Sequence, residues 1–396
     1  NVPGGADVPL VVQVGKWRRQ VTLPTVTDCV DNPLTDPELT RLPRTQSEGD
    51  MPQIAVTTGV RDSLECLLRT IGIADSEFTT DGGAGRVHLY YGGDLSGPNG
   101  AGVGPSAFDA TLNGGAAFSS AATLWADAAK MMNYDIQLYD CEGAGAESPK
   151  APYRENFLAY VNGGGRAFLG HYHYYWVQQA ALAGTANYLT GSGDLPQGGI
   201  TAYIDTSFPK AAALADWMVN LGVTPRGEFE ILEGQHSVAG VNAPTQEWIY
   251  VPVNPLDEQE RRSTQYMTFN TPLDVAEESQ CGRVVFTDLH VAAGEGEAAR
   301  DVTAPFPGNC SRAPLTAQGK ALEFLFFDLS ACIEPPEVIT VPPPPPDVPP
   351  VEPPPATTAP PAPPTLPPPP TDAPPLSETP PPAPPPPPPP PPPELR

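Results

Sequence analysis

The sequence has few basic residues and no long apolar run. Its 21 lysine and arginine residues stand against 46 aspartate and glutamate residues, and the formal net charge is −25. A chain with this excess of negative charge repels phosphate backbones, which argues against nucleic acid as a partner. No apolar stretch approaches the ~18 residues that a membrane-spanning helix requires. We therefore expect no membrane span.

The six cysteines lack the spacing of a zinc-binding motif. They form no CxxC pair and no Cys/His zinc pattern. In an acidic, lysine-poor chain they are typical of an extracellular or cell-surface protein, where cysteines pair as disulfides. We favour a bridge between Cys281 and Cys310, which flank a Gly/Pro-rich loop, although other connectivities stay open. The expected disulfide cysteines are Cys29, Cys66, Cys141, Cys281, Cys310 and Cys332.

The C-terminal end lacks the residues of a globular core. Of the 55 residues from 342 to 396, 33 are proline, and Pro384–Pro393 is unbroken. Consecutive prolines fix φ and remove amide donors, so we expect residues 334–396 to form a polyproline II tail. It either packs against other copies, with contacts from Pro384 to Pro393, or is a free linker. Its candidate glycosylation sites are Thr357, Thr358, Thr365 and Thr371.

Strand and helix patterns alternate between residues 53 and 333. Apolar runs predict strands at 53–57, 86–91, 134–139, 166–170 and 283–287. Periodic segments predict helices at 62–71, 119–132, 154–162, 208–221 and 316–329. This alternation predicts an α/β fold with a flavodoxin-like parallel sheet. The β-rich stretch 228–270 predicts added antiparallel strands.

The first 30 residues predict a separate β segment. Two β-rich runs, 8–14 and 17–23, are joined at Gly15-Lys16 and indicate a hairpin. Two strands alone are marginal in water, so we expect the hairpin to need a partner sheet. Residues 31–52 are polar and read as a linker.

Histidines and carboxylates follow two of the predicted strands. Ligands of open parallel sheets collect at the carboxyl ends of strands. His171 and His173 follow the strand at 166–170, and Asp288 and His290 follow the strand at 283–287. In an extended segment residues two apart share a face, so these four are candidate ligands of an anion or of a divalent metal such as zinc, iron or nickel. A histidine pair of this spacing in an aromatic-rich loop is more often a packed, hydrogen-bonded cluster.

Two further groups near these positions have alternative interpretations. The aromatic side chains around the histidines would form a glycan-stacking face, a core or an interface; they are Tyr172, Tyr174, Tyr175 and Trp176. Four acidic residues among glycines would bind calcium or form a solvated loop, since they match no EF-hand spacing; they are Asp75, Glu77, Asp81 and Asp94.

Cys141 follows a predicted strand, as nucleophilic cysteines do in several α/β enzymes. Asp140 and Glu142 flank it. Their negative charge raises the pKa of the thiol and works against a reactive thiolate. We therefore favour a disulfide over a nucleophile at this position.

Several segments resemble the trehalose-utilisation (ThuA-like) branch of the class I glutamine amidotransferase-like fold. They are Tyr134–Ile136, Glu155–Arg166 with its three glycines, and His171. Residues 282–288 and the helix at 316–329 are similar to that family's closing strand and last helix. The resemblance covers about 53–333 and implies a flavodoxin-like sheet. Only His171 corresponds to a family position. Cys141 does not correspond to the glutaminase cysteine, because it does not lie in a Gly-x-Cys-x-Gly elbow.

Residues 1–23 resemble the last strands of a carboxypeptidase regulatory-like β-sandwich, and the whole combination resembles large secreted proteins of myxobacteria. From these patterns we expect an extracellular surface or filament subunit that forms homo-oligomers through its proline-rich tail. The alternative is a secreted metal-dependent hydrolase, or a glycan-binding module for polysaccharide, tethered by the tail.

Overall fold

The computed structural model describes residues 4–93, 104–143, 150–178, 181–196, 199–223, 225–290, 303–311 and 313–331. Residues 1–338 form one compact unit and residues 339–396 a second, which lies outside the described residues. The expectations placed on the tail, including the contact run Pro384–Pro393 and its threonines, fall there. The filament and glycosylation hypotheses stay predictions.

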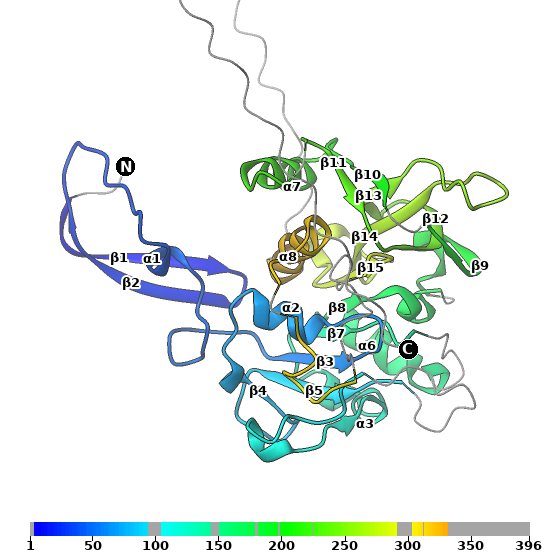
Figure 1. The fold of residues 1–396 in the computed structure, drawn as a ribbon, viewed down its shortest axis with the longest axis horizontal. Helices are drawn as coiled ribbons and strands as arrows, with labels where there is room; N and C mark the ends of the chain where they lie inside the picture. The colour runs from blue at the N-terminus through cyan, green and yellow to red at the C-terminus, as the bar shows by residue number, and fades with distance from the viewer. Residues whose placement is uncertain are drawn as a thin grey trace, which may run out of the picture. The chain divides into compact units, whose positions relative to one another are not determined.

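An eleven-stranded sheet organises the described part of the chain (Figure 1). Its parallel strands, in spatial order, are β4 (Phe78–Thr79), β5 (Val87–Tyr91), β3 (Ile54–Thr58), β7 (Ile136–Tyr139), β8 (Arg166–Leu169) and β15 (Gly282–Thr287). The short strand β6 (Ser119–Ser120) also pairs with β5. The order β5-β3-β7-β8-β15 is the flavodoxin-like arrangement. The α/β prediction is therefore confirmed.

Antiparallel strands extend the sheet beyond β15. They are β14 (Ser263–Thr271), β13 (Gln246–Val251), β10 (Ile200–Ile204) and β11 (Glu228–Ile231). Two more strands, β9 (Ala186–Asp194) and β12 (Gln235–Val241), form a small sheet of their own. The prediction of added antiparallel strands is confirmed as well.

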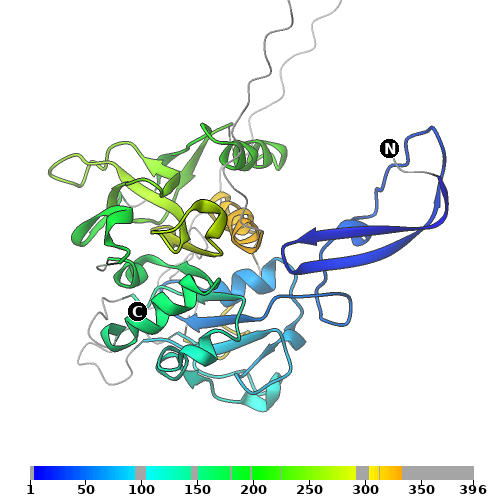
Figure 2. The same ribbon diagram turned by 180° about the vertical axis from the view of Figure 1, so that it is seen from behind.

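Helices cover both faces of the sheet (Figures 1 and 2). One apolar core contains residues of α2 (Leu64–Thr70), α7 (Pro209–Asn220) and α8 (Ala317–Ser330), and the other contains residues of α3 (Ala121–Trp125), α4 (Ala128–Met131) and α6 (Arg154–Asn162). Alternate residues of β3 supply the two cores: Ile54 and Val56 face the first, and Ala55 the second. This is the two-sided burial expected of a parallel sheet. No described helix is long and apolar enough to cross a membrane.

The predicted helix at 119–132 is divided in two. Asp127 has an extended backbone, and its side chain accepts a hydrogen bond from the amide of Lys130 at 3.1 Å, so it caps a new helix, α4. The other helices with described bounds are short. They are α1 (Pro37–Thr40) and the 3-10 helices η1 (Asp75–Glu77), η2 (Asn113–Gly115), η3 (Ala151–Tyr153), η4 (His171–Trp176), η5 (Ala183–Thr185) and η6 (Glu277–Ser279).

The N-terminal hairpin is confirmed as β1 (Gly5–Val14) and β2 (Trp17–Val26). The two strands form a two-stranded sheet (Figure 2). A helix rather than a partner sheet anchors the hairpin, because Trp17 is 2% exposed and its ring lies 5.8 Å from that of Phe326 in α8. Its indole nitrogen also donates to the carbonyl of Pro43 at 3.1 Å.

Candidate functional site

The strand order reverses between β3 and β7, and ligands of this fold bind where such a reversal occurs. The loops that leave these two strands approach each other closely. The amide of Arg61 donates to the carbonyl of Cys141 at 3.0 Å. A Cβ at Gly59 would lie 2.3 Å from the same carbonyl oxygen, so this close approach requires glycine.

Cys141, His171 and His290 form a buried cluster at this end of the sheet. Their candidate ligand atoms all lie within 4.8 Å of one another. The thiol of Cys141 is 3.7 Å from Nδ1 of His171, and the rings of His171 and His290 are 5.7 Å apart. The three residues follow β7, β8 and β15, so the parallel sheet brings together groups that are distant in sequence.

Asp62 holds two members of this cluster in place. Nδ1 of His290 donates to one carboxylate oxygen at 3.0 Å, and the amide of Cys141 donates to the other at 3.1 Å. Burial alone would lower the pKa of His290, but the adjacent Asp62 carboxylate raises it. A carboxylate bound to Nδ1 fixes the ring and leaves Nε2 as the nitrogen that presents a lone pair, as in many metal sites.

The surroundings favour the neutral thiol of Cys141 and the neutral imidazole of His171. Burial, and then the Asp62 carboxylate, hold the pKa of the Cys141 thiol well above its usual value, while the amides of Gly143 and Tyr172 oppose this shift. Burial, and then His290, hold the pKa of His171 well below its usual value. A thiol beside a neutral imidazole is not the thiolate–imidazolium pair of a cysteine nucleophile. A divalent cation would instead stabilise the thiolate directly.

The donor set selects among metals. One sulfur and two imidazole nitrogens suit zinc or iron, whereas calcium requires oxygen ligands. The acidic residues considered for calcium have other partners: Asp75 pairs with Arg69 at 2.6 Å, and Asp81 pairs with Lys130 at 2.6 Å. The Glu77 carboxylate accepts backbone hydrogen bonds from Gln46 and Arg86. Asp94 lies outside the described residues.

Two of the four predicted metal ligands do not join the cluster. The expected extended segment is the 3-10 helix η4, in which residues two apart point in different directions. His173 therefore turns away from His171. Its Nε2 donates to the carbonyl of Asp140 at 2.8 Å, and its Nδ1 accepts from Trp176 at 3.0 Å. With both ring nitrogens bonded, His173 is not a candidate ligand.

Asp288 is also separate from the cluster. One of its carboxylate oxygens accepts a hydrogen bond from the amide of Ser237 at 2.7 Å, which ties β12 to the end of β15. The carboxyl is fully buried, and this burial raises its pKa to about 7. Asp288 thus supports the wall of the site.

The aromatic residues of η4 belong largely to the core. Tyr174 is 1% exposed and Trp176 is 2% exposed, so neither can stack on a glycan from solvent. The ring of Trp176 stacks on Phe157 at 5.2 Å. Tyr172 and Tyr175 are partly buried. The four therefore do not form the exposed platform that a glycan would require.

A buried ion pair lies beside the cluster. Nζ of Lys150 is 2.7 Å from a carboxylate oxygen of Glu142, and both side chains are 2% exposed. The other oxygen of Glu142 accepts from the amide of Gly93 at 3.0 Å. This arrangement joins the residues that follow β5 to those that follow β7.

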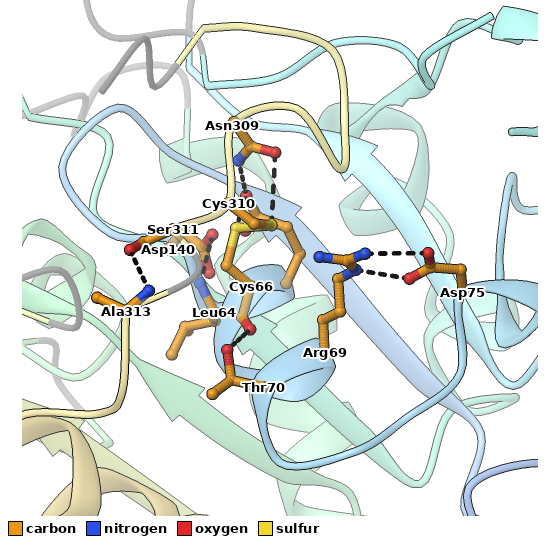
Figure 3. Close-up of a disulfide and its surroundings, with 11 residues drawn as sticks. Leu64, Cys66, Arg69, Thr70, Asp75, Asp140, Asn309, Cys310, Ser311 and Ala313 are labelled. Atoms are coloured by element: carbon orange, nitrogen blue, oxygen red, sulfur yellow. Dashed lines mark hydrogen bonds and ion pairs between the residues drawn. A yellow bond between two sulfur atoms is a disulfide. The ribbon is translucent and has the colours of Figure 1, made fainter. Parts of the chain in front are cut away.

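The disulfide connects Cys66 to Cys310, at the start of α2 (Figure 3). The preferred pairing of Cys281 with Cys310 is wrong. Cys281 precedes β15, whose six residues span roughly 20 Å, whereas Cys310 lies near α2. The described thiols of Cys29, Cys141 and Cys281 are free, contrary to the expectation of disulfides there. Cys332 lies outside the described residues.

Sequence reasoning missed Asp62 and misassigned Cys141. The signal for Cys141 was its place directly after a strand, and the same signal applies to Asp62, which follows β3 after a short turn. Nothing local in the sequence indicates that either residue contacts His290.

Asn309, in a formal Asn-x-Ser glycosylation motif, is fully buried and donates to the carboxylate of Glu65 at 2.5 Å, so the folded chain does not present it for glycosylation.

Comparisons with known proteins give one weak structural likeness. No family model matches the chain, and no curated protein matches it. Among solved structures, a protein from Bacteroides uniformis described as ThuA-like aligns with a TM-score of 0.34 and 10% identity, over 69% of this chain and 88% of that one. Its description names the family that the sequence resembles. We draw no functional conclusion from a likeness at this level.

Proposed function

We propose that the α/β body is a metal-dependent hydrolase whose ion, zinc according to the donor set, is bound by Cys141, His171 and His290. The observation that carries this proposal is the convergence of the three buried ligand atoms within 4.8 Å of one another. Three protein ligands are the set that catalytic zinc sites commonly use, with water or substrate as the fourth ligand.

The surrounding residues support the same assignment. Asp62 orients His290 through a 3.0 Å hydrogen bond, as carboxylates do behind zinc-bound imidazoles. The amides of Gly143 and Tyr172 face the sulfur of Cys141 and favour its thiolate form. His171 stays neutral and so keeps a lone pair for coordination. His171 is therefore already in the form that coordination requires, whereas binding of the cation would release the proton of Cys141.

The chemistry follows from the ion and its position. Bound zinc lowers the pKa of a water to about 7 and so supplies a nucleophile near neutral pH. In the hydrolysis proposed here, the water oxygen would bond to the electrophilic atom of the substrate, the bond to the leaving group would break, and one proton of the water would pass to that group. The position of the cluster supports the proposal, because open parallel sheets bind ligands at the carboxyl ends of strands such as β3, β7, β8 and β15.

Metal analysis of the purified full chain tests the proposal. We expect one zinc per chain, which the single variants Cys141→Ser, His171→Ala and His290→Ala each release. Cys281→Ser is the matched control, because this exposed thiol lies outside the cluster. Cobalt substitution should add a thiolate-to-cobalt absorption band that disappears in Cys141→Ser. Equal metal content in the wild-type chain and all three ligand variants would contradict the site.

A further inference from the structure

The disulfide and Asp62 lie at the same end of α2. Cys66 is in the first turn of this helix, and Asp62 comes just before it. The N-cap residue, Ser63, makes no side-chain capping hydrogen bond. The start of α2 is held instead by Asp140, which accepts from the amide of Leu64 at 3.2 Å, and by the covalent bridge to Cys310 (Figure 3).

The bridge also positions a polar contact next to Asp62. Asn309 precedes Cys310, is fully buried, and donates to the carboxylate of Glu65 at 2.5 Å. Glu65, Asp62 and Asp140 are three buried carboxyl groups around the start of α2. Burial, and then the Glu65 carboxyl, raise the pKa of Asp140 well above its usual value. The Asn309 amide, next to the bridge in the sequence, supplies the hydrogen bond that orients Glu65 in this group.

We propose that the Cys66–Cys310 disulfide is a redox control of the metal site, an inference that rests on the proposed function. With the bridge closed, the start of α2 keeps the Asp62 carboxylate against Nδ1 of His290. With the bridge open, Asn309 and the first turn of α2 relax, Asp62 shifts, and metal affinity falls. The segment that carries Cys310 stays near the body, because Phe306 is fully buried and its ring packs 4.8 Å from that of Phe78.

The chemistry of opening is thiol–disulfide exchange. Cys310 is partly exposed and Cys66 is 6% exposed, so we take the Cys310 sulfur as the point of attack by a small dithiol. A thiolate of the dithiol bonds to the Cys310 sulfur, and the Cys66 sulfur leaves and takes a proton. The second thiol of the reductant then forms its own disulfide and releases Cys310 as a thiol. Two electrons pass from the dithiol to the protein.

The experiment compares zinc affinity in the oxidised and reduced full chain. The protein is reduced, freed of reductant without air, and titrated with zinc against a competing chelator. We expect reduction to weaken binding about 10- to 100-fold, the usual effect of losing support behind a metal ligand. Reoxidation should restore the affinity. Because coupling is reciprocal, zinc should also make the protein disulfide harder to reduce. With saturating zinc, the ratio of reduced to oxidised dithiol reagent at which half of the protein is reduced should rise by the same factor.

Variants separate control of the site from general damage. The Cys66→Ser/Cys310→Ser pair should reproduce the reduced affinity, whereas Cys29→Ser and Cys281→Ser should leave it unchanged in the oxidised chain. Far-ultraviolet circular dichroism should show the same fold in both redox states. Equal zinc affinity in both states would overturn redox control and leave the metal site intact. An unfolded reduced chain would also overturn it, and zinc binding in neither state would remove the proposed function itself.

Discussion

Asp62 and His290 are 228 positions apart in the sequence, and their side chains are joined by a 3.0 Å hydrogen bond from Nδ1 of the imidazole to Oδ1 of the carboxylate. The same carboxylate accepts from the amide of Cys141 at 3.1 Å. One side chain after β3 therefore positions groups that follow β7 and β15. This makes Asp62 the positioning residue whose replacement tests the site without removing a ligand.

Asp62→Asn should lower zinc affinity about 10- to 100-fold while the three ligands remain. An amide carries no negative charge, so it neither raises the pKa of His290 nor strengthens its Nε2 as a donor. The measurement is chelator competition with the full chain, and Asp75→Asn serves as control because Asp75 pairs with Arg69 instead. An affinity equal to that of the control would show that the carboxylate has no part in binding.

Lys150→Met should destabilise the fold by about 3–5 kcal/mol, because it leaves the buried carboxylate of Glu142 without its cation. The double variant Glu142→Gln/Lys150→Met should recover most of the loss, since no buried charge is left. Denaturant unfolding of the two variants and the wild type measures the difference. If the double variant is as unstable as the single one, the loss comes from packing and not from charge.

The same pair predicts a pH dependence. Burial would raise the pKa of Glu142, but Lys150 and His173 lower it overall. A carboxyl with a lowered pKa stabilises the fold above its unfolded value of about 4.3 and loses this contribution as the pH falls through the folded value. Without Lys150, burial raises the pKa, and stability is lost as the pH rises instead. The difference in free energy of unfolding between the wild type and Lys150→Met, measured with denaturant, should therefore become smaller from pH 7 to pH 4. A difference that does not change with pH would refute this account.

Trp17→Ala should detach the hairpin from α8 and cost about 3–5 kcal/mol of stability. The indole is 2% exposed, and its ring lies 5.8 Å from that of Phe326 and 5.6 Å from that of Phe327. Limited proteolysis should cleave residues 5–26 faster in this variant than in Trp17→Phe, which keeps an aromatic ring. Similar cleavage of the two would mean that other contacts anchor the hairpin.

Local patterns predicted much of the fold. The helix α6 has the predicted bounds, Arg154–Asn162, and Thr316 caps α8 as its position indicated, because its side chain accepts from the amide of Gly319 at 3.1 Å. These features depend on residues a few positions apart. The division of the helix at 119–132 was missed, because a single capping aspartate outweighed the helical pattern.

The site was only partly predictable for a physical reason. Position after a strand identified His171 and His290 as candidate ligands and drew attention to Cys141. That Cys141 and Asp62 meet these histidines depends on which loops lie together, and this follows from the strand order. The segment after β8 was expected to be extended. The hydrogen bond from Trp176 to His173 and the packing of Trp176 favour the 3-10 helix η4 instead.

The four groups of the cluster, Asp62, Cys141, His171 and His290, come from the ends of four separate strands. No fragment of half the chain length therefore contains all four residues, and a single loop transferred to another protein would bring only one of them. Searches for comparable centres in other chains must compare three-dimensional positions of side chains, since their linear spacing spans 229 residues, from 62 to 290 inclusive.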